Sequence, residues 1–183
     1  MLFPTTKSRD LMFETPTSRA NTVNTHHSLI LGLVATDCIA AVIIAVYLQS
    51  AWELYPCPLC ILQRYFFIAL GLFSLFSLLL KPGKLRDFSS AFCLLLALGG
   101  AAAAAWHVWI LHHPAADCGR DAVGEFINGL PMAQWFPSVF YATGSCIDEI
   151  PPVLGMSFPV WALILFSLSA LVLAASLLRR LRA

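Results

Sequence analysis

Four long apolar stretches alternate with polar segments along this chain. They cover residues 29–48, 61–80, 91–111 and 160–178. Each has about the 20 apolar residues that a helix needs to cross a bilayer. Only helices and closed barrels satisfy the whole backbone in lipid, and these runs are too long for barrel strands. The pattern predicts an all-α membrane protein, a bundle of four transmembrane helices.

The composition leaves room for one membrane domain. Of the 183 residues, 59% are hydrophobic and 11% are charged, whereas a soluble domain carries about a quarter charged residues. We expect a single domain over residues 29–178, with the lipid bilayer as its surroundings. The net charge is +1 and no basic run occurs, so nucleic acid is not an expected partner.

Basic residues predict the orientation. Nine of the eleven lysines and arginines flank the predicted helices on one face: Lys7, Arg9, Arg19, Lys81, Lys84, Arg86, Arg179, Arg180 and Arg182. The positive-inside rule makes that face cytoplasmic. Residues 1–28 then form a cytoplasmic tail that we expect to be poorly ordered, and residues 179–183 a basic cytoplasmic tail. The loops at about 49–60 and 112–158 lie outside the cytosol.

A cleaved signal peptide is the alternative interpretation of the N-terminal region. Its apolar part would have about 7–15 residues followed by a small-residue cleavage site. Here the apolar run has 20 residues and continues without a convincing site. Cleavage would also leave three spans, so we favour an uncleaved first helix.

Two further segments carry structural expectations. The small residues 99–105 let helix backbones approach closely, so the third predicted helix should pack inside the bundle rather than face lipid. The segment 112–158 is too long for a plain connector. Its aromatic-rich part, residues 126–141, predicts short helical structure in the membrane interface; a folded extramembrane loop is the alternative.

Six cysteines fall into two groups. Cys38 and Cys93 lie inside predicted helices, where cysteine packs as a small hydrophobic residue. The other four, Cys57, Cys60, Cys118 and Cys146, lie in the predicted non-cytosolic loops, where disulfides persist. Two static disulfides would fit this placement. A four-cysteine zinc site is disfavoured, since Cys118 and Cys146 are 28 positions apart rather than a second close pair. No metal is therefore expected.

The surroundings of Cys60 favour redox chemistry. Cys60 stands at the start of the second predicted helix, where the helix dipole favours negative charge. Arg64 lies one turn further on the same face, and its positive charge favours the thiolate. A stiff Cys-x-x-Cys at a helix start, with Pro56 and Pro58 around Cys57, is typical of dithiol oxidoreductases. The alternative for Arg64 is snorkelling to the membrane interface.

The chain resembles the disulfide bond formation protein B (DsbB) family over roughly residues 29–178. The resemblance rests on four pieces of sequence: PCPLCILQR at 56–64, DC at 117–118, WFPSVFYATGSC at 135–146 and LGMSFPVW at 154–161. It implies a bacterial inner-membrane oxidoreductase that reoxidises a DsbA-like periplasmic thiol oxidase. The electrons would pass to a membrane quinone, either ubiquinone or menaquinone.

The resemblance also implies residue roles. Cys118 would form the mixed disulfide with the partner, Cys146 would be its disulfide mate and exchange with Cys57, and Cys60 would donate to the quinone. Arg64 would stabilise the Cys60 thiolate and the quinone's developing negative charge. The family implies a histidine near the quinone, for which His107, His112 and His113 are candidates, with His112 preferred. Asp37 is an intramembrane acid to which no role is assigned.

Three other functions stay open at this point. The same chemistry could serve one dedicated exported substrate instead of a general oxidase. A vitamin K epoxide reductase-like enzyme would place its Cys-x-x-Cys differently in the bundle. A non-catalytic membrane scaffold with two structural disulfides would hold no quinone at all.

Overall fold

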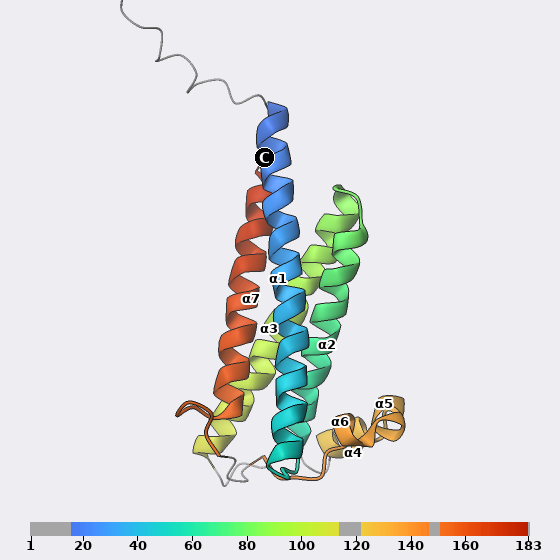
Figure 1. The fold of residues 1–183 in the computed structure, drawn as a ribbon, viewed down its shortest axis with the longest axis vertical. Helices are drawn as coiled ribbons and strands as arrows, with labels where there is room; N and C mark the ends of the chain where they lie inside the picture. The colour runs from blue at the N-terminus through green and yellow to red at the C-terminus, as the bar shows by residue number, and fades with distance from the viewer. Residues whose placement is uncertain (1–15, 114–121, 147–150, 183) are drawn as a thin grey trace, which may run out of the picture.

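The fold is a bundle of long helices with short helices at one end (Figure 1). The computed structural model describes residues 16–113, 122–146 and 151–182, with side chains from residue 21 onward. The four long helices are α1 (Pro16–Ala51), α2 (Pro58–Leu79), α3 (Lys84–His112) and α7 (Phe158–Leu181). The short ones are α4 (Ala122–Asn128), α5 (Pro131–Trp135) and α6 (Pro137–Phe140). The prediction of an all-α protein is confirmed.

The four long helices form a closed bundle. α1 packs against α2 and α7, and α3 packs against the same two helices from the other side. Each is long and apolar enough to cross a membrane. The start of α1, the α2–α3 connection and the end of α7 lie at one end of the bundle, and α4 to α6 lie at the other (Figure 1). The predicted basic positions of the α2–α3 connection and of α7 therefore share an end.

The first helix begins earlier than predicted. α1 starts at Pro16, whereas hydropathy placed its start at residue 29 and a poorly ordered tail before it. The reason is polar packing. The buried His27 contacts the hydroxyls of Ser90 on α3, at 3.0 Å, and Ser176 on α7, at 3.2 Å. Arg86 donates to the Ser28 hydroxyl at 2.7 Å. Contacts between polar side chains thus extend α1 beyond the apolar run, and a hydropathy pattern does not detect such contacts.

The small residues of α3 pack inside the bundle on one face of the helix. Ala97, Gly100 and Ala104 are buried on that face, whereas Ala102 and Ala105 are exposed. A Cβ at Gly100 would meet the ring of Phe166 on α7. That ring in turn stacks on Phe67 of α2, with centroids 3.9 Å apart. The absent side chain at Gly100 therefore lets three helices meet around one aromatic pair.

The short helices α4 to α6 are folded onto the bundle. Ile127, Ala133 and Phe140, one from each short helix, are buried against Ile61 of α2. The Asn128 amide also donates to the carbonyl of Ala142 and accepts from its N–H. The short helices agree with the predicted helical structure at residues 126–141, and their position in a membrane interface stays a prediction.

Candidate redox site

The Cys-x-x-Cys motif begins α2. Cys57 is the N-cap residue, in an extended conformation, and Pro58 occupies the first turn. Proline suits this position because its missing N–H would have no partner within the helix. The Cys57 Sγ accepts a hydrogen bond from the Cys60 N–H at 3.2 Å. Capping thus turns the first sulfur back toward the second.

The two sulfurs of the motif lie side by side. Cys57 Sγ and Cys60 Sγ are 2.6 Å apart, so a disulfide between them requires little movement. Cys57 is only 1% exposed, whereas Cys60 is half-buried. The pair therefore has an inner sulfur, which belongs to the buried Cys57, and an outer sulfur, which belongs to the partly exposed Cys60.

Cys146 from the long loop packs beside the inner sulfur. Cys57 and Cys146 share a buried cluster with Leu59 and Ile110, and their side chains are hydrogen-bonded. Burial, followed by the hydrogen bonds with Cys146 and then Cys60, raises the pKa of the Cys57 thiol well above its ordinary value. Three of the four predicted redox cysteines therefore meet at one place. Cys118 lies outside the described residues.

Backbone contacts hold the loop in this register. The N–H groups of Thr143 and Gly144 both donate to the carbonyl of Pro56, at 3.0 and 3.1 Å. A Cβ at Gly144 would meet the carbonyl oxygen of Tyr55, so a glycine is needed for this close approach. The chain just before Cys146 is thereby attached to the chain just before Cys57.

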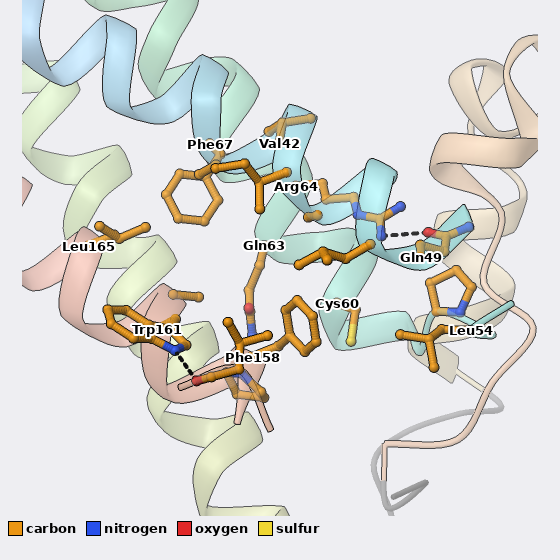
Figure 2. A pocket seen from close by; sticks show the side chains of 18 of the residues that line it. Val42, Gln49, Leu54, Cys60, Gln63, Arg64, Phe67, Phe158, Trp161 and Leu165 are labelled. Atoms are coloured by element: carbon orange, nitrogen blue, oxygen red, sulfur yellow. Dashed lines mark hydrogen bonds between the residues drawn. The ribbon is translucent and has the colours of Figure 1, made fainter. Parts of the chain in front are cut away.

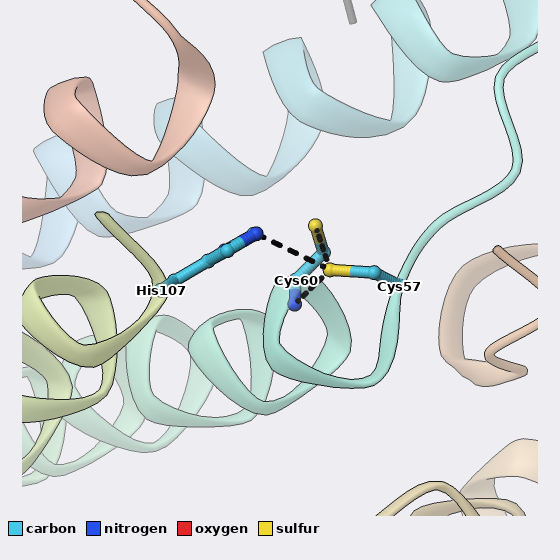
Figure 3. A group of neighbouring side chains, drawn as sticks. All are labelled: Cys57, Cys60 and His107. Atoms are coloured by element: carbon cyan, nitrogen blue, oxygen red, sulfur yellow. Dashed lines mark hydrogen bonds between the residues drawn. The ribbon is translucent and has the colours of Figure 1, made fainter. Parts of the chain in front are cut away.

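His107 of α3 completes the sulfur cluster. Its Nε2 lies 3.6 Å from Cys57 Sγ (Figure 3). Its Nδ1 lies 3.3 Å from the amide nitrogen of Gln63. A further hydrogen bond joins the ring to the backbone of Cys146. His107 and Gln63 are both buried. A buried, hydrogen-bonded histidine beside two sulfurs is able to exchange protons with them.

Arg64 is held by the protein and does not extend into solvent. It is buried, and its guanidinium donates to Gln49 Oε1 at 2.6 Å and to the Val139 carbonyl at 2.7 Å. The Gln49 amide donates in turn to the carbonyl of Ser138 at 3.0 Å. Arg64 thus joins α2 to the end of α1 and to α6, which fixes the position of its charge.

Cys60 and Arg64 face a common cavity of about 290 Å³ between α1, α2 and α7 (Figure 2). Its apolar walls include Val42, Phe67 and Leu165. The following lining residues carry polar side-chain atoms: Gln49, Tyr55, Cys60, Gln63, Arg64 and Trp161. Ligand sites of this kind pair apolar walls with a few convergent polar groups.

The turn before α7 closes one side of the cavity. Val153 and Met156 exchange two backbone hydrogen bonds around a tight turn. The Trp161 indole N–H donates to the Val153 carbonyl at 3.0 Å, as Figure 2 shows. Trp52 packs edge-on against Phe158 at 6.1 Å between centroids. The chain just after α1 and the start of α7 are therefore in contact beside the cavity.

The structure places the three candidate histidines differently. His112, preferred from sequence, is exposed, and its ring N–H donates to the Val108 carbonyl at 2.8 Å. His113 is also exposed and stacks on Trp109. None of the three histidines is among the residues that line the cavity described above. His107 is the one that lies beside Cys57 and Cys60. A quinone-proximal role for His112 remains a prediction without a supporting contact.

Sequence reasoning also missed Gln49 and Gln63. Both are uncharged polar residues near the ends of apolar helices, where polar side chains inside a membrane are costly and mark functional positions. His107 had a signal too. It continues the buried stripe of Ala97, Gly100 and Ala104 at helical spacing, whereas His112 does not lie on that face.

Four membrane-spanning helices with a Cys-x-x-Cys pair between a loop cysteine and an apolar cavity define a multi-pass membrane thiol oxidoreductase. The family model described as disulfide bond formation protein DsbB matches residues 27–176. The chain is 41% identical over 148 residues to disulfide bond formation protein B of Ralstonia nicotianae, covering 81% of this chain and 92% of that protein.

Two further relatives carry corresponding names. Disulfide bond formation protein B 1 of Pseudomonas syringae pv. syringae is 39% identical over 154 residues, covering 84% of this chain and 89% of that protein. Disulfide bond formation protein B of Burkholderia pseudomallei is 39% identical over 150 residues, covering 82% and 89%. This chain belongs to the DsbB family, whose members are bacterial inner-membrane proteins of disulfide bond formation.

Proposed function

We propose that this protein reoxidises a DsbA-like periplasmic thiol oxidase and passes the electrons to a membrane quinone, ubiquinone or menaquinone. One observation carries the proposal. The Cys57–Cys60 pair lies between Cys146 of the long loop and the cavity that Cys60 lines. Electrons that enter at the loop therefore have a short route through sulfur atoms to a site open to a lipid-soluble acceptor.

The cavity suits the ring of a quinone. Its walls are mostly apolar, and the polar side chains of its lining include a thiol, two amides and one guanidinium. Arg64 and Gln63 are the residues that would hold the carbonyl oxygens of the ring, because each can donate a hydrogen bond. A bound quinone supplies an acceptor for two electrons and two protons.

The exchange among the cysteines conserves disulfides at each step. A thiolate of the partner attacks Cys118 of the Cys118–Cys146 disulfide, which gives a mixed disulfide and releases Cys146. The second partner thiol then displaces Cys118, and the partner leaves oxidised. The Cys146 thiolate attacks Cys57 Sγ of the Cys57–Cys60 disulfide, forms the Cys57–Cys146 bond and releases Cys60 as a thiolate. The Cys118 thiolate then attacks Cys146, which restores the Cys118–Cys146 disulfide and releases Cys57. Reoxidation of the Cys57–Cys60 dithiol to the disulfide would deliver two electrons and two protons to a bound quinone.

The surroundings of each sulfur support this direction. Cys146 already packs against Cys57, and the two side chains are hydrogen-bonded. The raised pKa of Cys57 makes it the less stable thiolate, so the negative charge is better placed on Cys60. Arg64, on the next turn, stabilises that charge across the low-dielectric cavity. His107, beside Cys57 Sγ, is suited to give and receive the proton of that thiol.

The proposal is tested by measuring quinone reduction by the purified protein, with a reduced thiol oxidase as the electron donor. Cys60→Ser should abolish quinone reduction, because the outer sulfur is lost. Cys93→Ala, which alters a buried cysteine of the bundle core, should leave turnover within a few-fold. Visible absorbance should also show a band with added quinone that depends on the Cys60 thiolate.

The alternatives give different results. A non-catalytic scaffold would hold no quinone and would show no reduction in either variant. A protein dedicated to one exported substrate would reduce quinone with that substrate but not with a general thiol oxidase. Normal quinone reduction by Cys60→Ser would remove the proposed route.

A further inference from the structure

The sulfur cluster also has the composition of a metal site. One ligand atom from each of Cys57, Cys60 and His107 lies within 4.8 Å of the other two (Figure 3). Two thiolates and one imidazole are the donor set of zinc and of other cations that prefer sulfur. This set belongs to the redox pair itself, so a bound cation would use the same sulfurs as the proposed electron transfer.

We propose that the reduced protein binds one thiophilic divalent cation, best matched by zinc, at Cys57, Cys60 and His107, and that the bound cation inhibits turnover. The inhibition, though not the binding, rests on the proposed function. Binding replaces the protons of two thiols with one cation and releases two protons, so no electrons are transferred. A Cys57–Cys60 disulfide has no thiolate, so the oxidised protein does not bind the cation at this site.

The distances fit a tetrahedral centre. With Zn–S and Zn–N bonds of ordinary length, a bound sulfur and nitrogen lie about 3.6 Å apart. Cys57 Sγ and His107 Nε2 are 3.6 Å apart in the structure. Two bound sulfurs lie about 3.8 Å apart in the same geometry, whereas Cys57 Sγ and Cys60 Sγ are 2.6 Å apart. Binding of the cation therefore requires only that the two sulfurs move apart. Reduction permits this movement because no bond then joins them.

Gln63 provides the outer support that metal-binding histidines use. Metal-bound imidazoles almost always donate their second ring N–H to a neighbouring acceptor, which fixes the tautomer. Gln63 lies 3.3 Å from His107 Nδ1. Rotating its amide by half a turn presents Oε1 to that nitrogen, since the two amide atoms occupy equivalent positions. Nε2 is then left unprotonated and directed at the sulfurs.

Cys146 and the cavity supply a fourth ligand and an entrance. The Cys146 side chain is hydrogen-bonded to Cys57, so its thiolate is able to complete the four-coordinate set that closed zinc sites have. Coordination by Cys146 releases a third proton. Cys60 lines the cavity, which gives a cation a route to the sulfurs. A cation there also occupies the sulfur from which electrons would leave.

Cobalt binding by the full-length protein tests the site directly. Cobalt replaces zinc in such sites and gives thiolate-to-metal absorption. The protein is reduced in detergent without oxygen, freed of reductant and titrated with Co²⁺. We expect one equivalent to produce the absorption, and added Zn²⁺ to displace it. Protein oxidised to the disulfide should give no such absorption.

Variants identify the ligands. His107→Ala should weaken Co²⁺ binding at least about tenfold, because loss of even an outer partner has that effect. Gln63→Leu, which keeps all three ligands, should weaken it by about tenfold to hundredfold. His26→Ala, an exposed histidine at the other end of α1, is the matched control and should change nothing. Thermal unfolding of each metal-free variant checks that the fold is intact.

Two results would overturn the assignment: equal Co²⁺ binding by oxidised and reduced protein, or unchanged binding in folded His107→Ala and Gln63→Leu together. Neither measurement uses quinone or a partner, so their outcome is independent of the proposed function. In a second arm, Zn²⁺ should inhibit quinone reduction by the original protein, and a chelator should restore it. Binding without inhibition would refute the inhibitory role alone.

Discussion

The guanidinium of Arg64 donates a 2.6 Å hydrogen bond to Gln49 Oε1, and this contact joins the second helix to the end of the first. Both side chains line the cavity that Cys60 faces. The position of the positive charge is therefore set by a partner on another helix. A charge that is fixed before a reaction stabilises developing negative charge without the cost of reorganisation.

Replacing Arg64 should affect quinone chemistry more than folding. Arg64→Met keeps much of the apolar stem and removes the charge. We expect a higher KM for a soluble quinone analogue and lower turnover, with kcat/KM reduced roughly tenfold to hundredfold, the range for lost hydrogen bonds to a charged group. Arg64→Lys should restore only part, because a point charge cannot reproduce the planar fork. Steady-state kinetics measures both variants.

If Arg64 served only as an anchor at the membrane interface, the kinetics of its variants would differ from this expectation. Arg64→Met and Arg64→Lys would then both show near-normal KM and turnover. The Cys118–Cys146 disulfide should form in each variant, which alkylation and mass spectrometry verify. Retained disulfide with impaired quinone kinetics separates an electrostatic role from a general loss of structure.

Gln49 should act through Arg64. Gln49→Leu removes the partner of the guanidinium and the contact with Ser138, while it keeps a similar volume. We expect a higher quinone KM, with an effect smaller than that of Arg64→Met because the charge remains. In the double variant the two effects should not add, since both remove one interaction. Ser50→Ala, which alters an exposed hydroxyl bonded within α1, is the control.

The raised pKa of Cys57 gives a pH prediction for the reduced protein. A thiol whose pKa is raised stays protonated to higher pH, and only the thiolate reacts with alkylating agents. The midpoint of the pH profile for alkylation of Cys57 should therefore lie above its ordinary pKa of 9.0. Mass spectrometry follows this residue, and the same cysteine in the denatured chain is the control. Equal midpoints in the folded and denatured protein would contradict the effect of burial.

The spans could be predicted from the sequence because membrane insertion depends on local apolar length. Cys57 and Cys60 could also be placed at a helix start, since proline and the apolar run fix where α2 begins. The choice of His107 over His112 could not be made from distance along the chain. It depends on helical phase and on the packing of α3, which bring His107 to the sulfurs and leave His112 exposed.

The approach of Cys146 to Cys57 was likewise implied by family resemblance and not by local pattern. Two long helices and three short ones separate residues 57 and 146 along the chain, and their contact follows from tertiary backbone bonds at Pro56. The early start of α1 was missed for a related reason. His27 and Ser28 are polar, and only the hydroxyls and the arginine that other helices bring to them make a helix there favourable.

The point of attack by the partner can be trapped. Cys57 and Cys146 are both buried, which disfavours either as the first sulfur to meet a thiolate from outside. We expect a thiol oxidase variant that lacks its resolving cysteine to accumulate as a mixed disulfide with Cys118, because exchange passes through such an adduct. Mass spectrometry of the cross-linked peptide identifies the sulfur. A cross-link to Cys57 would reverse the proposed order.

The orientation in the membrane can be tested with two single cysteine substitutions. Glu125→Cys on α4 and Lys84→Cys at the start of α3 are both exposed and lie at opposite ends of the bundle. With the basic end in the cytoplasm, a membrane-impermeant thiol reagent should label Glu125→Cys on intact spheroplasts. Lys84→Cys should react only after the membrane is permeabilised. The reverse pattern would place the redox cysteines on the cytoplasmic side.

Thr143 and Gly144 both donate hydrogen bonds to the Pro56 carbonyl, and these two bonds hold Cys146 close to Cys57 within one molecule. Tethering reactants in this way replaces a diffusional encounter with a high local concentration. The acceptor is a main-chain oxygen, so no side-chain substitution can delete it. The rate of disulfide exchange between Cys146 of the loop and Cys57 should therefore be independent of the concentration of the protein in the membrane. The rate of the whole cycle is then left to the supply of partner and acceptor.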